Sequence, residues 1–257
     1  MAKIIAVANQ KGGVAKTTTT VNLGAALVEA GQRVLLIDLD PQGHLALSLG
    51  INPDDLEKST FNLLTEPRTS ITDITLTLPN GLCLAPGDIN LSVAETRLAG
   101  MIGREQMLRD KLRPVAAQYD YILMDCPPSL GVLTVNALTA ANWVIIPVQA
   151  HYLSMKGMQL LMETIAVVRE KLNPELSIRG LLLTMVDVRT RISGQAIDAL
   201  HEMFPDKLFT AMVRQNTKVI EASASGMSVL EAASSSSAAQ AYRELAQEIL
   251  HGKASGV

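Results

Sequence analysis

The sequence is poor in aromatic residues and in cysteine, and each shortage narrows the classes of protein to which it can belong. Phe, Trp and Tyr make up 3% of the 257 residues, whereas hydrophobic residues of all kinds make up 48%. Aliphatic side chains must therefore fill the core, as is typical of a parallel sheet covered by helices on both faces. Cys83 and Cys126 lie in unrelated contexts, which argues against a disulfide framework or a zinc site and fits a reducing compartment.

Long apolar runs and a strong charge of either sign are also missing. No uncharged apolar run approaches the roughly 20 residues of a membrane span, and the first residues lead into a strand pattern without the apolar core of a signal peptide. The net charge of −3 argues against a protein that coats nucleic acid through bulk charge, and leaves room for a local basic patch. No linker-like stretch divides the chain, so we expect one cytoplasmic domain over residues 1–257.

Short apolar runs alternate with helical stretches along the whole chain. A first helix is expected over Lys16–Ala30, and a last helix over Ala238–Leu250, where the serine run Ser234–Ser237 can cap it. Prolines make residues 52–80 the least regular region. The expected strands are Lys3–Asn9, Arg33–Asp38, Gly81–Ala85, Tyr121–Asp125, Trp143–Val148 and Ile178–Val186. This alternation of strands and helices predicts an α/β fold, a doubly wound, mostly parallel twisted sheet with helices on both faces. In such a fold, ligands bind at the carboxyl ends of the strands.

A glycine-rich turn between the first strand and the first helix is the most informative segment. It reads Lys11-Gly12-Gly13-Val14-Ala15-Lys16-Thr17-Thr18. Such a turn points backbone N–H groups and a helix N-terminus at one spot, which makes an anion site. Lys16 would neutralise the β- and γ-phosphates of a nucleoside triphosphate, and the Thr17 hydroxyl would bind Mg²⁺, as in a Walker A loop. The competing interpretation is a Gly-Gly turn whose lysines are merely solvated.

The loop departs from the usual Walker A spacing. Glycine would be expected at positions 10 and 15, where this chain has Gln10 and Ala15. A Cβ at a loop position with positive φ costs on the order of 1 kcal/mol. A nucleotide-binding scaffold with negligible turnover is therefore an alternative to an active enzyme.

Three carboxylates stand at the ends of two predicted strands. Asp38 and Asp40 project with a two-residue period from the end of the second strand, toward the phosphate loop. Asp125 closes the apolar strand Tyr121–Asp125, where an acidic residue can hold a water ligand of Mg²⁺, and Pro127 and Pro128 stiffen the turn that follows. For Asp38 and Asp40, a turn capped by aspartates is the alternative.

Together these segments resemble the ParA/MinD family of ATPases, and in their order the ParA/Soj branch of partition ATPases. The Lys-Gly-Gly-x-x-Lys-Thr segment is similar to the family's deviant Walker A loop. Residues 38–43 are similar to its Asp-x-Asp-Pro-Gln-Gly box, and residues 125–128 are similar to its Asp-x-Pro-Pro switch. The resemblance implies an ATP hydrolase that uses Mg²⁺ and dimerises with ATP. Its implied catalytic residues are Lys11, Lys16 and Asp40, with Lys11 reaching the partner's nucleotide, Asp40 acting on the attacking water, and Asp38 holding the metal's water shell.

The resemblance also extends to later segments. Residues 147–157 resemble the part of the family that frames the dimer interface. Arg189, Arg214 and Lys218 fall where ParA proteins hold DNA phosphates without reading bases, which implies nonspecific DNA binding, association with the nucleoid and a ParB-like or cargo adaptor partner. Gln215 and Asn216 would lie beside the adenine base. A solvated surface, with Asp187 and Glu221 compensating the cations, is the alternative for the basic residues.

Two alternative resemblances imply different functions. A membrane-surface ATPase similar to MinD needs a basic amphipathic tail, and residues 242–250 mix Arg243 with Glu244 and Glu248, so we expect no membrane binding. An iron-sulfur reductase related to the nitrogenase iron protein needs cluster cysteines, whose local patterns are absent around Cys83 and Cys126.

Overall fold

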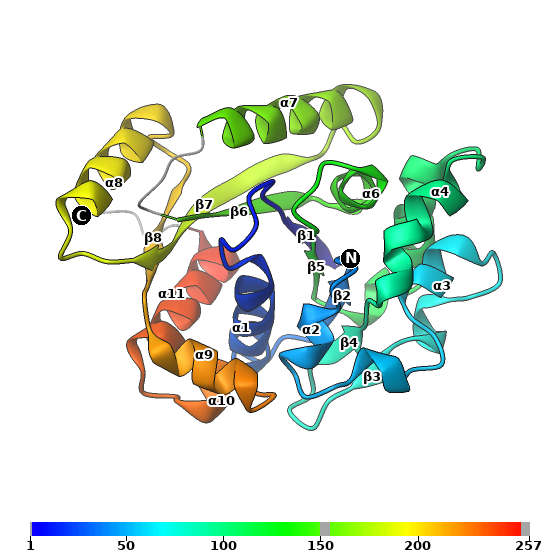
Figure 1. Cartoon of the computed structure of the whole chain (residues 1–257), viewed down its shortest axis with the longest axis horizontal. Helices are drawn as coiled ribbons and strands as arrows, with labels where there is room; N and C mark the ends of the chain where they lie inside the picture. Colours follow the sequence, from blue (N-terminus) through cyan, green and yellow to red (C-terminus); the bar gives the residue numbers. More distant parts are fainter. Residues whose placement is uncertain (1, 150–154, 253–257) are drawn as a thin grey trace.

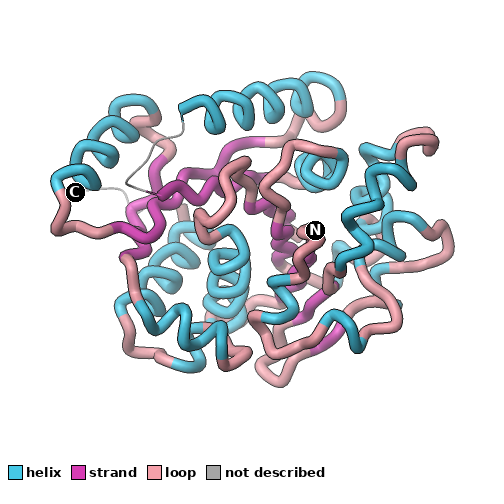
Figure 2. Tube along the Cα trace, viewed as in Figure 1, coloured by secondary structure: helices cyan, strands magenta, loops and turns pink. Residues whose placement is uncertain are grey.

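The computed structural model describes residues 2–149 and 155–252. Its strands, magenta in Figure 2, form one sheet in the order β3-β4-β2-β5-β1-β6-β7-β8. Among the described residues, every strand pairing is parallel except the antiparallel pair β3 and β4. The strands are β1 (Lys3–Val7), β2 (Val34–Asp38), β3 (Leu76–Thr77), β4 (Cys83–Ala85), β5 (Tyr121–Asp125), β6 (Trp143–Gln149), β7 (Ser177–Val186) and β8 (Leu208–Arg214). This confirms the predicted doubly wound, mostly parallel sheet.

Helices cover both faces of the sheet (Figure 1). They are α1 (Lys16–Glu29), α2 (His44–Leu47), α3 (Thr60–Thr65), α4 (Ala94–Leu98), α5 (Met107–Leu112), α6 (Val132–Ala140), α7 (Met155–Lys171), α8 (Arg191–Met203), α9 (Thr217–Ala224), α10 (Val229–Ala232) and α11 (Ser237–His251). Helices α1 and α11 lie side by side on one face, and α6 and α7 lie on the other.

Two apolar clusters fill the space between the sheet and its helices. Along β5, Ile122 and Met124 join the cluster that includes α6 and α7, whereas Tyr121 and Leu123 join the cluster that includes α1 and α11. Successive strand side chains point to opposite faces, so a strand buried on both faces must be apolar throughout. The central strands are apolar for this reason, and their polar residues are concentrated at their carboxyl ends.

The helix boundaries follow local sequence signals. Helix α1 begins at Lys16 as predicted and ends at Glu29, and Gly31 follows with φ of 81°. Ser236 caps α11, since its side chain accepts a hydrogen bond from the Ala239 N–H at 3.2 Å. The serine run therefore caps the last helix, as expected.

Two strands were missing from the sequence prediction. Strand β8 at one edge of the sheet and the two-residue β3 at the other were not assigned, and the predicted strand Gly81–Ala85 begins only at Cys83. Within the irregular region, a capping box between Ser59 and Asn62 starts α3. These short edge elements depend on tertiary pairing, which a local pattern does not reveal.

Candidate nucleotide site

The glycine-rich turn connects β1 to α1 at the carboxyl edge of the sheet. Gly13 and Ala15 adopt left-handed conformations, with φ of 70° and 65°, and Ala15 is the N-cap residue of α1. The Asn9 amide ties the turn to β6 by donating to the Pro147 carbonyl at 2.7 Å, while its oxygen accepts from the Lys11 N–H at 3.0 Å. The loop is thus held by contacts from outside itself, which is how strained backbone is maintained.

A cavity of about 450 Å³ opens above this loop. It is lined by Gly12, Gly13, Ala15, Lys16, Thr17, Thr18, Asp40, Gln42, His44, Pro128 and Met185. Lys16 is 7% exposed, and its Nζ donates to the Lys11 carbonyl at 3.1 Å. Burial lowers the pKa of Lys16, and the nearby Asp125, Cys126 and Asp40 oppose that shift. A buried ammonium that donates to a loop carbonyl is well placed to exchange that contact for phosphate oxygens.

The Thr17 hydroxyl and Asp125 meet at the end of β5. Thr17 Oγ1 donates to Asp125 Oδ2 at 2.6 Å, joining residues 108 positions apart. Asp125 is 1% exposed, and burial raises its pKa to about 7, opposed by the Thr17 hydrogen bond and by Lys16. Its other oxygen, Oδ1, is buried without a hydrogen-bond partner among the described residues.

These two side chains fit a magnesium site of the kind that nucleotides complete. A water molecule bound to Mg²⁺ would donate to Asp125 Oδ1, and Thr17 Oγ1 would supply a direct ligand. Across residues 2–149 and 155–252, no group of three or more His, Cys, Asp or Glu side chains could hold a metal. Phosphate oxygens and water must then supply the other ligands, as is usual for Mg²⁺.

Asp38 and Asp40 are two residues apart but have different surroundings. Asp38 is fully buried, and its two oxygens accept from the Asp40 N–H at 2.9 Å and the Leu45 N–H at 3.1 Å. Burial and the neighbouring Asp125 raise the pKa of Asp38 well above its usual value. Asp40 lines the cavity, and its Oδ1 accepts from the Gln42 N–H at 3.0 Å. Asp38 therefore shapes the turn that presents Asp40, and its role near Mg²⁺ stays a prediction.

The Lys11 side chain contacts the end of β6 and does not line the cavity above its own loop. Its Nζ donates to Gln149 Oε1 at 3.2 Å, at the end of β6, and Lys11 is not among the residues that line the cavity. Residues 147–149 of the predicted interface segment lie in β6, whereas 150–154, including His151, lie outside the described residues. The two lysines of the motif thus have separate positions: Lys16 inside the cavity and Lys11 beside it.

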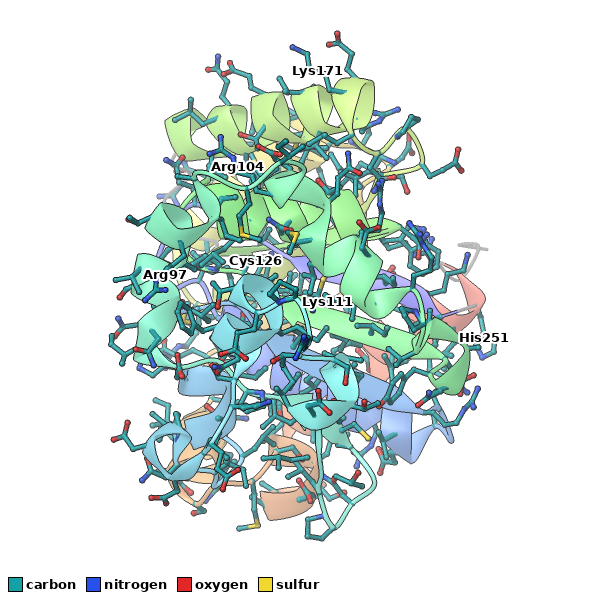
Figure 3. The ribbon with its side chains drawn as sticks, turned by 90° about the vertical axis from the view of Figure 1, so that its right-hand side faces the viewer. Arg97, Arg104, Lys111, Cys126, Lys171 and His251 are labelled. Atoms are coloured by element: carbon teal, nitrogen blue, oxygen red, sulfur yellow. The ribbon has the colours of Figure 1, made fainter. Side chains whose placement is uncertain are left out.

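Cys126 follows Asp125 and packs in the apolar core. It is fully buried, and Figure 3 shows it in the interior, whereas Arg97 and Lys171 lie at the periphery. Burial, with Asp125 nearby, raises the pKa of the thiol. A thiol held in its neutral form is a poor nucleophile and a poor metal ligand.

The three predicted DNA-binding cations lie at the carboxyl edge of β7 and β8. Arg214 ends β8 and pairs with Val186, the last residue of β7. Arg189 lies three positions after Val186 in the chain. Lys218 is in the first turn of α9. Arg189 pairs with Asp187 at 2.9 Å and Lys218 with Glu221 at 2.7 Å, the two acidic residues named above as compensating partners.

Gln215 and Asn216 follow β8, next to the strand that supplies Met185. The Gln215 N–H donates to the Val186 carbonyl at 3.2 Å, and the Asn216 side chain caps α9 by accepting from the Lys218 N–H at 2.9 Å. Neither residue is in the lining of the 450 Å³ cavity. Their proposed contact with adenine therefore stays a prediction.

The sequence interpretation did not identify several residues that form the site. Gln42, His44 and Met185 line the cavity, Asn9 anchors the loop, and Thr184 Oγ1 donates to the Val14 carbonyl at 3.1 Å. A buried threonine near the end of an apolar strand is a signal for such a role, because a hydroxyl in a core needs a partner. The partner itself, 170 positions away, has no local signal.

Comparison with known proteins assigns the family. A family model described as an AAA domain matches residues 2–178. The sporulation initiation inhibitor protein Soj of Bacillus subtilis is 43% identical over 97% of this chain and 98% of its own length. The chromosome partitioning protein ParA of Caulobacter vibrioides (strain NA1000 / CB15N) is 42% identical over 96% of this chain and 94% of its own.

The chain belongs to the ParA/MinD family of ATPases. A structure from Mycobacterium smegmatis called cobyrinic acid a,c-diamide synthase, with bound ADP and magnesium, is 38% identical with a TM-score of 0.86, covering 97% of this chain and 94% of that one. MinD from Pyrococcus horikoshii, with Mg-ADP, shares the fold at 24% identity and a TM-score of 0.78 over 97% and 96% of the two chains. Membership of this family makes the protein a P-loop ATPase, with ATP as its nucleotide and Mg²⁺ as its metal cofactor.

Proposed function

We propose that this protein is a partition ATPase of the ParA/Soj type that dimerises with ATP, binds DNA without sequence preference and positions a cargo through a ParB-like or other adaptor partner. The observation that carries the proposal is the separation of the two motif lysines. Lys16 serves the cavity of its own protomer, whereas the Lys11 ammonium lies beside that cavity, at Gln149. A lysine at this rim can meet the triphosphate of a second protomer that faces the loop.

The nucleotide would act as a switch through contacts that only the triphosphate form provides. Thr17 and Asp125 would hold Mg²⁺, which when bound would supply positive charge beside the β- and γ-phosphates. Asp40, half-buried at the cavity wall, orients the attacking water. A ligand shifts a conformational equilibrium only through its different affinity for the two states, so γ-phosphate contacts made across an interface would favour the dimer until hydrolysis removes them.

The candidate DNA surface consists of Arg189, Arg214 and Lys218. The two ion pairs of this surface are exposed: Arg189 is 85% and Lys218 54% accessible, and such pairs contribute little to stability. Either cation can therefore exchange its carboxylate for a DNA phosphate. Phosphate contacts release counterions and make binding salt-dependent and independent of sequence. Dimerisation would bring two copies of this small basic patch to the DNA. A local patch of this kind allows DNA binding even though the net charge of the chain is −3.

The names of the relatives support the partition role. Soj is called a sporulation initiation inhibitor, and the Caulobacter and Myxococcus xanthus relatives are called chromosome partitioning proteins. By analogy, DNA and the adaptor would stimulate hydrolysis here, release the dimer from the nucleoid and so move a plasmid, a chromosome region or a protein assembly.

A membrane-surface role similar to MinD is less well supported. The apolar side of α11 is buried against α1 and β8, with Tyr242, Leu245 and Ile249 at most 2% exposed. A helix whose apolar face is already packed has no free face for a lipid interface. Among the described helices, none is both long and apolar enough to cross a bilayer.

DNA pelleting with ATP or ADP tests the proposal. We expect the protein to sediment with nonspecific duplex DNA in the presence of Mg²⁺ and ATP, and to stay in the supernatant with ADP. Retention should fall steeply as salt rises, because bound phosphates displace counterions. Equal sedimentation with ATP and ADP, or none with either, would contradict nucleotide-controlled DNA binding.

A further inference from the structure

Helix α2 and the end of α9 meet between the nucleotide cavity and the candidate DNA surface. His44 at the start of α2 lines the cavity, and Lys218 in the first turn of α9 belongs to the candidate DNA surface. Figure 1 shows α9 running from the end of β8 toward α2. Residues 223–229, from the end of α9 to the start of α10, form what we call the relay turn. We propose that the contact between α2 and the relay turn transmits the arrival of the γ-phosphate to α9 and so raises the affinity of the candidate DNA surface; the inference rests on the proposed function and names its regulation.

Two glycines form the closest part of this contact. Gly50 follows α2 and Gly226 follows α9, and both have left-handed backbones, with φ of 74° and 68°. A Cβ built on Gly226 would lie 2.6 Å from the Gly50 Cα and 2.9 Å from the Gly50 N. Both distances are shorter than a Cβ atom tolerates, and the atoms it would meet belong to the backbone, so rotating a side chain cannot relieve the clash. The two backbones therefore pack directly on each other, and close packing of this kind transmits a displacement of one segment to the other.

Side-chain hydrogen bonds hold the relay turn from two directions. The Ser223 hydroxyl donates to the Ser48 hydroxyl at 3.1 Å, which joins α9 to the residue that follows α2. The buried side chain of Asn22 in α1 accepts from the Val229 N–H at 2.7 Å and donates to the Thr18 carbonyl at 2.8 Å. Thr18 lines the cavity. The relay turn is thus bonded to α1 and to the end of α2, the two helices that begin at the cavity.

Helix α2 is the element through which the γ-phosphate would act. It begins directly after the turn that presents Asp40, and the buried Asp38 accepts from the Leu45 N–H at 3.1 Å. Because Asp40, Gln42 and His44 all line the cavity, a γ-phosphate that reorders this turn would also move α2. Helix α2 has four residues and α9 has eight, so they span about 6 Å and about 12 Å. Two short helices in direct contact therefore connect the cavity to the candidate DNA surface, which is the kind of contiguous packed route that can carry coupling.

The coupling must be separated from the effect of dimerisation. A dimer with two DNA patches binds more tightly than a monomer through avidity alone. The measured quantity is therefore the ratio of the DNA dissociation constants with Mg²⁺-ADP and with Mg²⁺ and a nonhydrolysable ATP analogue, in variants whose dimer mass is unchanged. Coupling between two sites typically changes affinity by roughly 5- to 150-fold.

Gly226→Ala is the first test, because its Cβ would force the relay turn away from α2. Fluorescence anisotropy with a labelled duplex of random sequence gives the ratio, and light scattering with the analogue gives the dimer mass. We expect the ratio to fall at least fivefold, with the dimer mass unchanged and the affinity for the analogue without DNA within about twofold of wild type. Gly31→Ala is the matched control, since Gly31 also has positive φ, 81°, and a Cβ there meets no atom within 4 Å. It should keep the wild-type ratio.

The hydroxyl pair gives a second test that does not depend on the folding of Gly226→Ala. Ser48→Ala and Ser223→Ala remove the same hydrogen bond, so each should lower the ratio about two- to threefold, and the double variant should be no worse than either single variant. Ser225→Ala is the control within the relay turn, because the Ser225 hydroxyl donates to the Glu221 carbonyl of its own helix at 2.9 Å. It should leave the ratio unchanged. Additive losses in the double variant, or an equal loss in Ser225→Ala, would overturn the proposed link.

The outcomes distinguish this inference from the proposed function. If Gly226→Ala weakens DNA binding equally with both nucleotides, the ratio is unchanged, α9 is merely displaced, and the relay is overturned. Loss of the dimer in Gly226→Ala would also overturn it, because the dimer interface would then account for the lost response. Equal DNA affinity of the wild-type protein with ADP and with the analogue would contradict the proposed function and, with it, this inference. A wild-type ratio that persists in Gly226→Ala and in the serine variants would contradict this inference alone.

Discussion

Replacing Ala15 by glycine should stabilise the protein, although glycine usually destabilises. Ala15 has φ of 65° and ψ of 36°, a left-handed conformation that costs an L-residue roughly 1–2 kcal/mol. Glycine removes that strain but adds freedom to the unfolded chain, which offsets about 0.4–1 kcal/mol. The net expectation is a rise of about 0.5–1 kcal/mol in the free energy of unfolding. For a chain of this size, that corresponds to a Tm increase of roughly 1–3 °C.

Ala166→Gly provides a matched control. Ala166 is exposed and lies inside α7, so the same substitution there removes a good helix former without relieving strain. It should lower the free energy of unfolding by about 1 kcal/mol. The assay is thermal unfolding of both variants and wild type without nucleotide, followed by thermal shift on adding ATP and Mg²⁺.

The sign of the change decides whether the strain argument holds. We expect Ala15→Gly to melt above wild type and Ala166→Gly below it. Ala15→Gly should also keep at least the wild-type ATP affinity, since the loop retains every backbone donor. If Ala15→Gly lowers the Tm as much as Ala166→Gly does, Ala15 is not strained and the reasoning is refuted.

The other predictions concern charge at the site and at the candidate DNA surface. Lys16→Ala should lose ATP binding in calorimetry, whereas Lys11→Ala should retain binding and lose the ATP-dependent dimer in gel filtration; the same defect in both would contradict separate roles. Burial raises the pKa of Asp125 to about 7, so its protonated form dominates below that pH, and Mg²⁺ favours the ionised form. The affinity for Mg²⁺-ATP should therefore rise between about pH 6 and 8, and a profile unchanged in Asp125→Asn would show that another group titrates. Lys218→Glu should weaken DNA pelleting at constant ATP affinity, while Lys171→Glu, the same change at the exposed end of α7, should not; equal losses would point to net charge alone.

Much of the site could be predicted because its signals are local. The apolar strand Tyr121–Asp125 has the predicted bounds, and the glycine-rich turn leads into a helix at Lys16 as expected. Strand-terminal aspartates converge because parallel strands end at one edge of the sheet. Thr17 and Asp125 therefore meet, although 108 positions separate them.

The remaining features depend on contacts that a local pattern does not contain. Asn9 and Lys11 each bond to a residue 138 positions away, at Pro147 and Gln149. The positive φ of Met185 follows from a bulge between β7 and an edge strand that the sequence did not reveal. The different surroundings of Asp38 and Asp40 also arise from the fold, since the Leu45 N–H that satisfies Asp38 belongs to the helix after the turn.

The most direct test of the account is the mass of Asp40→Ala with and without ATP, measured by light scattering after gel filtration in Mg²⁺. Asp40 lines the cavity and is proposed to act on the attacking water, so its loss should leave binding intact and prevent release of the γ-phosphate. We expect a stable dimer with ATP, a monomer with ADP, and a monomer with ATP when Lys11→Ala is added. A monomer of Asp40→Ala at saturating ATP would contradict the ATP-dependent dimer, and with it the switch on which the proposed function depends.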